Sequence, residues 1–169
     1  MKYAYLHKNF RNLSFEKKTI FLSHTVTLLF CFFPWFSASP VYTEEFFYTA
    51  FGGPSFLMGI IIFFISFVVF LLFLDQLFEK QKINLPVSEN LLYFTAGAQQ
   101  FLLLILVWSV LTMVGRDFEN HEIRFGLFLA IISQICGLVA TFLNYQLDQQ
   151  KKAKEFFSHT TEQKKESNK

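Results

Sequence analysis

Charged residues are scarce in this chain of 169 residues. Lysine, arginine, aspartate and glutamate together make up 17 % of the sequence, against roughly 25 % in an average soluble domain. This deficit argues against an ordinary water-soluble domain. The net charge of +2 is also too small to indicate nucleic-acid binding, so no nucleic-acid partner is expected.

Cysteine is equally sparse. The chain has only Cys31 and Cys136, each inside an apolar run, and they form neither a CxxC pair nor a zinc-ligand spacing. No arrangement of acid, base, nucleophile or metal ligand stands out elsewhere. The sequence therefore predicts no cofactor, no metal site and no enzymatic activity.

Apolar residues are abundant, at 53 % of the chain with 25 phenylalanines. A transmembrane helix needs about 20 mostly apolar residues to cross a hydrocarbon core about 30 Å thick. Four stretches without a charged residue reach this length, at about 19–37, 55–74, 91–114 and 125–147. Helices satisfy every backbone group within one segment, and the alternation of a membrane β-barrel is absent. The predicted fold is all-α, a polytopic membrane four-helix bundle over residues 14–147.

The basic residues predict how the bundle is oriented. Arg116 and Arg124 are the only ones on one side of the predicted membrane, while all others flank the first stretch, join the second to the third, or follow the fourth. Under the positive-inside rule, both termini are cytoplasmic. We expect a multi-pass protein of the cell (inner) membrane.

The two ends of the chain carry weaker signals. Residues 1–13 place aromatic and leucine side chains on one helical stripe, which favours a short cytoplasmic interfacial helix over an ordinary frayed terminus. Ser14 is positioned to cap the next helix, with Glu16 in its first turn. Residues 148–169 form a polar cytoplasmic tail, which we expect to be largely disordered after a turn or two of helix.

Polar side chains inside the apolar stretches are the best functional candidates, because they are costly in hydrocarbon unless they are paired. Helix rise puts five of them at similar depths in the cytoplasmic half of the bundle: His24, Gln99, Gln100, Thr141 and Asn144. They either join helices by hydrogen bonds or form a small proton or ligand site in which His24 titrates. The second alternative lacks the intramembrane carboxylate usual in coupled transporters.

Small residues predict where helices approach closely. The candidate packing residues lie in the third and fourth stretches: Ala96, Gly97, Gly126, Ala130, Ser133 and Gly137. We therefore expect the third and fourth helices to form the tightest contact. The phenylalanine-rich second helix should face lipid or a partner helix.

Acidic and basic residues meet in the two predicted outer loops. Glu44 and Glu45 lie in the first loop, and Arg116 and Arg124 flank the second. We expect one arginine to pair with one glutamate, which at about 0–1 kcal/mol would orient the loops more than stabilise the fold. The aromatic residues of the first loop could alternatively bind a partner.

One pattern resembles a known group. It consists of residues 15–18 (FEKK), an apolar helix, residues 33–35 (FPW) and a short loop that ends in a glycine-rich turn. It is similar to uncharacterised small bacterial membrane proteins with four spans. The resemblance covers about the first sixty residues and implies no activity.

These observations favour a non-enzymatic membrane protein that acts by association. The leading hypothesis is a scaffold or accessory subunit of a membrane assembly, in contact with membrane lipid and with a protein partner or further copies of itself. The alternative is a small oligomeric transporter or channel subunit that uses the intramembrane polar cluster.

Overall fold

The computed structural model describes residues 10–11, 13–39, 44–77, 88–118 and 120–166. Over these ranges the protein is mostly helical, as predicted, with helices α2 (Phe15–Phe30), α3 (Phe56–Leu77), α4 (Glu89–Gly115) and α5 (Phe125–Glu166). Three segments are long and apolar enough to cross a membrane: Gly53–Asp75, Glu89–Gly115 and Phe125–Gln150. The predicted interfacial helix over residues 1–13 lies almost entirely outside the described residues.

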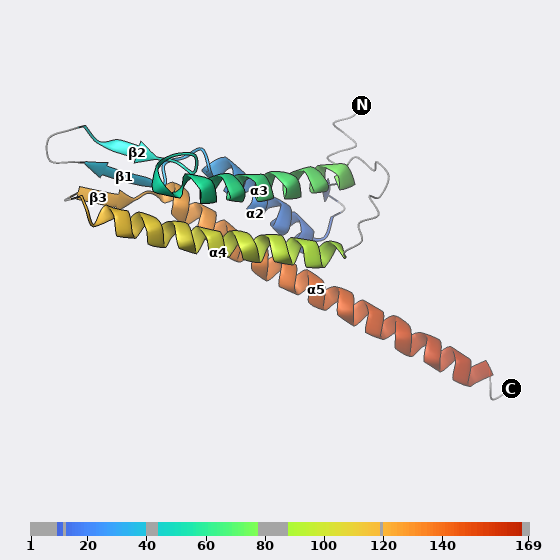
Figure 1. Ribbon diagram of the computed structural model, residues 1–169. Helices are drawn as coiled ribbons and strands as arrows, with labels where there is room; N and C mark the ends of the chain where they lie inside the picture. Colours follow the sequence, from blue (N-terminus) through green and yellow to red (C-terminus); the bar gives the residue numbers. More distant parts are fainter. Residues whose placement is uncertain (1–9, 12, 40–43, 78–87, 119, 167–169) are drawn as a thin grey trace, which may run out of the picture.

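The four helices pack side by side around a shared interior (Figure 1). Both α2 and α4 pack against α3 and α5, and the contact between α2 and α5 is the most extensive. The expectation that the third and fourth helices make the tightest contact is therefore wrong, since α5 lies more closely on α2 than on α4.

Helix α2 begins as predicted but ends early. The Ser14 side chain accepts a hydrogen bond from the Lys17 backbone N–H at 3.3 Å, so the predicted N-cap is confirmed. The helix ends at Phe30 rather than near Ser37. Pro34 explains part of this difference, because the residue before a proline disfavours the helical conformation.

A small sheet replaces the expected helical end and loops. Strands β1 (Phe36–Ser39), β2 (Phe46–Tyr48) and β3 (Asn120–Ile123) pair antiparallel in the order β2-β1-β3. The sheet lies at one end of the helices, here called the sheet end; the opposite end is the far end (Figure 1). A short 3-10 helix, η1 (Gly53–Ser55), connects β2 to α3.

Backbone hydrogen bonds tie the sheet to the helices. The Ala50 N–H donates to the Cys31 carbonyl at 3.2 Å, and the Arg124 N–H donates to the Trp35 carbonyl at 2.9 Å. The Trp35 indole donates to the Phe30 carbonyl at 2.7 Å and thereby satisfies an acceptor at the end of α2. Trp35 and Phe36 are fully buried.

Helix α5 is longer than its companions. Its 42 residues correspond to about 63 Å, and it runs past the far ends of α3 and α4 (Figure 1). The sequence predicts a largely disordered tail after residue 148, whereas α5 continues as a helix to Glu166 in the structure. A helix that is already formed extends at low cost, since only its nucleation is unfavourable.

The apolar interior is divided into two clusters. The sheet-end cluster contains Cys31, Trp35, Phe36, Ala38, Ala50, Ile62, Leu104, Val107, Leu111, Leu127, Ala130 and Ile131. The far-end cluster contains Ile20, Val69, Phe73, Tyr93 and Ala140. Helices α3, α4 and α5 contribute residues to both clusters. Helix α2 contributes to the far-end cluster, and the segment that follows α2 contributes to the sheet-end cluster. The division therefore crosses the whole interior.

Candidate functional site

A layer of buried polar side chains separates the two apolar clusters. On α4, for example, Gln100 lies between Tyr93 of the far-end cluster and Leu104 of the sheet-end cluster. All four helices contribute at the corresponding level, and we call these residues the polar layer: Ser23, His24 and Thr27 of α2, Ser66 of α3, Gln100 of α4, and Gln134 of α5. Each is at most 4 % exposed.

Gln100 connects α4 to α3. Its Nε2 atom donates to the Ile62 carbonyl at 2.9 Å and to the Ser66 hydroxyl at 2.5 Å, both on α3. Its side chain also lies near His24 on α2. The Gln100 amide therefore joins α4 to α3 at the level of His24.

Gln134 connects α5 to α2. Its Nε2 atom donates to the Thr27 hydroxyl at 2.9 Å, and that hydroxyl also shares a 2.9 Å hydrogen bond with the Ser133 hydroxyl. Gly137 allows this close approach, because a Cβ atom there would lie 2.3 Å from the Ser23 hydroxyl oxygen. These contacts explain why α2 and α5 pack so closely.

Three atoms of the polar layer have no hydrogen-bond partner among the described residues: His24 Nδ1, Gln100 Oε1 and Gln134 Oε1. An unpaired buried polar atom costs about 1–3 kcal/mol, so such atoms are uncommon. The polar layer therefore keeps unused hydrogen-bonding capacity, chiefly as acceptors, in the middle of the protein.

The structure separates the predicted intramembrane candidates. His24 and Gln100 interact in the polar layer, but the Thr141 hydroxyl donates to the Gly137 carbonyl of its own helix at 2.8 Å. Asn144 lies closer to the far end, and Gln99 is exposed on the outside of α4.

Four members of the polar layer, Ser23, Thr27, Ser66 and Gln134, are not among the predicted candidates. The depth of a residue along a helix does not tell which way its side chain points, and Ser66 is a single small polar residue in a phenylalanine-rich helix. A search for polar residues of every helix at a common level would have found all four.

A second polar group joins helices at the far end. Asn144 donates from Nδ2 to Asn90 Oδ1 at 2.6 Å, and Asn90 in turn donates to the Asp148 carboxylate. Lys17 on α2 pairs with Glu89 on α4 at 3.7 Å. These contacts hold α2, α4 and α5 together where they leave the apolar interior.

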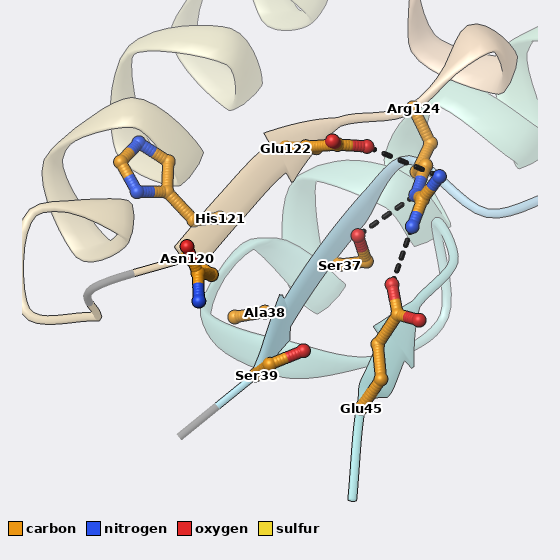
Figure 2. Close-up of a pocket in the computed structure, with 8 residues that line it drawn as sticks. All are labelled: Ser37, Ala38, Ser39, Glu45, Asn120, His121, Glu122 and Arg124. Atoms are coloured by element: carbon orange, nitrogen blue, oxygen red, sulfur yellow. Dashed lines mark hydrogen bonds and ion pairs between the residues drawn. The ribbon is translucent and has the colours of Figure 1, made fainter. Parts of the chain in front are cut away.

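Arg124 organises a polar pocket of about 470 Å³ at the sheet end (Figure 2). Its Nε atom donates to the Ser37 hydroxyl at 2.7 Å, and its Nη1 atom lies 3.1 Å from the Glu122 carboxylate. Its Nη2 atom pairs with Glu45. The guanidinium therefore links β1 to Glu122 within β3 and to Glu45, which directly precedes β2.

The remaining charged candidates of the sheet end, Glu44 and Arg116, make fewer contacts than Arg124. Glu44 and Arg116 are exposed, and no side-chain ion pair of either is present among the described residues. The His121 ring lies away from Arg124 (Figure 2), beside Phe36 and over Gly115. Over the described ranges, no group of three His, Cys, Asp or Glu residues could hold a metal ion.

The predicted packing residues lie mostly on the face of α5 toward α2. Ser133 and Gly137 meet Thr27 and Ser23. Gly126 lies against the Pro34–Trp35 segment, and Ala130 is fully buried in the sheet-end cluster. On α4, Gly97 faces α5, where a Cβ atom would lie 3.2 Å from Leu138 Cδ2, and Ala96 packs against the far-end cluster.

The comparisons with known proteins give no further assignment for these residues. No protein-family model, curated protein or solved structure matches the chain.

Proposed function

We propose that this protein is a non-enzymatic, multi-pass membrane protein that acts by association, as a scaffold or accessory subunit of a membrane assembly. In this proposal all four helices cross the cell (inner) membrane as a bundle, with α2 as the fourth span. The two termini are cytoplasmic and the sheet lies outside. The distribution of basic residues supports this orientation, since Arg116 and Arg124 are the only basic residues at the sheet end among those that the structure describes.

The observation that carries this proposal is the enclosed position of the polar layer. Its side chains bond from one helix to another, and apolar clusters close it toward both ends. Buried polar contacts of this kind can specify one arrangement of helices, as an asparagine does in a coiled coil. The interior is thus used for assembly of the bundle, which leaves the outer surfaces for function.

The test is the size of the protein's assembly in its own membrane. Cross-linking in cells followed by mild detergent extraction and native electrophoresis should give a discrete complex larger than one chain. The same sample in a denaturing detergent without cross-linking supplies the monomer reference. A chain that migrates as a lone monomer after both cross-linking and mild extraction would contradict the proposal.

The unused acceptors of the polar layer favour a second candidate function, that of a small oligomeric transporter or channel subunit. His24 Nδ1, Gln100 Oε1 and Gln134 Oε1 could bind a proton or a small polar solute at mid-depth. Purified protein in liposomes tests this by flux of protons and monovalent cations under imposed gradients.

His24→Ala should abolish such flux. Thr25→Ala is the matched control, because among the described residues the Thr25 hydroxyl bonds only within its own helix, to the Phe21 carbonyl at 2.8 Å. The absence of flux under every gradient would remove this candidate.

A further inference from the structure

We propose that two copies of this chain associate in the membrane through the exposed face of α4, where Gln99 of one copy pairs with Gln99 of the other. The inference rests on the proposed function, association within the membrane, and specifies one contact through which that association occurs. It starts from the position of Gln99, which is exposed on the surface while its neighbour Gln100 is fully buried.

Gln99 lies well inside an apolar span. It is ten residues from the start of the segment Glu89–Gly115, which corresponds to about 15 Å of helix. Its amide has no hydrogen-bond partner among the described residues, whereas the nearby Thr95 hydroxyl donates to the Leu91 and Leu92 carbonyls of its own helix. An amide left unpaired in hydrocarbon is costly, so Gln99 favours a partner from outside the chain.

The surroundings of Gln99 have the form of a helix-packing seam. Exposed residues recur along α4 at alternating spacings of four and three, which is the heptad pattern of a left-handed helix pair: Thr95, Gln99, Leu102, Leu106, Ser109 and Met113. A groove of about 330 Å³ between α3 and α4 borders this seam and includes Thr95 and Gln99.

The other helices lack this combination. The exposed side chains of α3 from Phe56 to Leu71, and of α5 from Phe125 to Leu143, are apolar or cysteine. These side chains can face lipid without cost. The exposed polar residues of α4 therefore make it the helix best suited to contact a partner.

A second copy is the partner that the chemistry fits best. Two copies inserted in the same orientation place Gln99 at the same depth, so a twofold axis along the membrane normal brings the two amides together. A primary amide carries both a donor and an acceptor, and the pair can therefore form two reciprocal hydrogen bonds. Such self-complementarity is what a symmetric interface requires.

Disulfide cross-linking of the purified, reconstituted full-length chain tests the interface. In a Cys136→Ser background, Leu106→Cys should form a cross-linked dimer on mild oxidation, because seam positions face each other. Ile132→Cys is the matched control on the exposed face of α5 and should stay monomeric. Equal cross-linking at both positions would overturn the proposal.

The role of the amide is tested separately by energy transfer between labelled copies, measured as lipid is added to dilute them. Gln99→Leu removes both reciprocal hydrogen bonds and should raise the dissociation constant of the dimer about 8- to 300-fold, which corresponds to twice the free energy typical of one interhelical hydrogen bond in a membrane. Gln99→Asn should retain most of the affinity, since it keeps the amide. An unchanged dissociation constant in Gln99→Leu would overturn the pairing.

The outcomes also separate this inference from the function on which it rests. A chain that is monomeric when reconstituted, yet forms a larger complex in its own membrane, would overturn the α4 dimer and leave the association proposal standing. A monomer in both settings would overturn both. Cross-linking of Leu106→Cys in cells only to a different protein would likewise overturn the dimer.

Discussion

Thr27 joins α2 to α5 through a single hydroxyl group. It contacts both Ser133 and Gln134, so it supplies two of the hydrogen bonds in the closest helix pair. Thr25, two residues away on the same helix, donates its hydroxyl to the Phe21 carbonyl of α2, and over the described ranges it has no bond to another helix. Two threonines of equal size and similar depth therefore differ in what they contribute to the fold.

Thr27→Val should lower the stability of the protein by about 1 kcal/mol, because it leaves the Gln134 amide without its acceptor in an apolar interior. Thermal unfolding in detergent micelles, followed by circular dichroism, measures the change. Thr25→Val keeps the same shape and should leave the melting temperature nearly unchanged. Equal effects of the two substitutions would show that the hydrogen bonds across the helix pair contribute little.

Arg124 has a comparable position at the sheet end, where it contacts Ser37, Glu45 and Glu122. Arg124→Lys should reduce the protection of β1 amides against hydrogen exchange, since a lysine cannot reproduce the forked geometry. We expect a loss of about 0.5–1 kcal/mol that shrinks at high salt. Arg116→Lys serves as the control, and a loss of protection as large as that of Arg124→Lys would contradict this role.

At the scale of the elements, the helices were predicted better from the sequence than the strands between them. Long uncharged stretches identify α3, α4 and most of α5, because lipid compatibility demands such stretches. The three strands were missed, since each has only three or four residues and β1 pairs with β3 from a distant part of the sequence. Nothing in a local window reveals such a pairing.

The side of a helix on which a residue lies was harder to predict than its depth along the helix axis. Helix rise predicts similar depths for His24, Gln99 and Gln100, but Gln100 is buried and Gln99 is exposed on the surface of α4. Helix α4 is apolar nearly all round, so no hydrophobic stripe marks its inner side. The direction of each side chain depends on contacts with the other helices, which the sequence of α4 does not contain.

The start of α3 is fixed by one glycine. A Cβ atom at Gly59 would lie 1.8 Å from the Ala50 carbonyl oxygen, and the Ala50 backbone is itself held by its hydrogen bond to Cys31. Gly59→Ala should therefore cost about 3 kcal/mol or prevent folding, as measured by the melting temperature and by the yield of monodisperse protein.

Gly97→Ala is the matched control for that substitution. The nearest atom to an added Cβ is Leu138 Cδ2 at 3.2 Å, the end of a flexible side chain, so the cost should stay below about 1 kcal/mol. A loss at Gly97 as large as that at Gly59 would mean that α4 and α5 are less adaptable than this contact indicates.

At the scale of the whole molecule, the proposed orientation puts the sheet and the end of α5 on opposite sides of the membrane. Glu122 is exposed at the sheet end, and Lys154 is exposed on the projecting part of α5. Their positions provide one reporter for each side.

In a Cys136→Ser background, Glu122→Cys should react with a membrane-impermeant maleimide in intact cells. Lys154→Cys should react only after the membrane is permeabilised. Cys31 is buried and should add little labelling. The opposite pattern would invert the orientation, and labelling of both positions from outside would contradict a crossing of the membrane by α5.

The continuity of α5 gives it a mechanical property. One unbroken helix begins beside β3, is held to α4 at Asp148 through Asn90, and continues to Glu166. The 18 residues beyond that point of attachment act as a lever arm of about 27 Å. A tilt of about 10° around it, well within the range that membrane helices adopt, would swing the free end by about 5 Å. The part of α5 between Phe125 and Asp148 is slightly longer, at about 34 Å, so in the proposed orientation a motion of the sheet would be passed to the other side of the bilayer with little loss of amplitude.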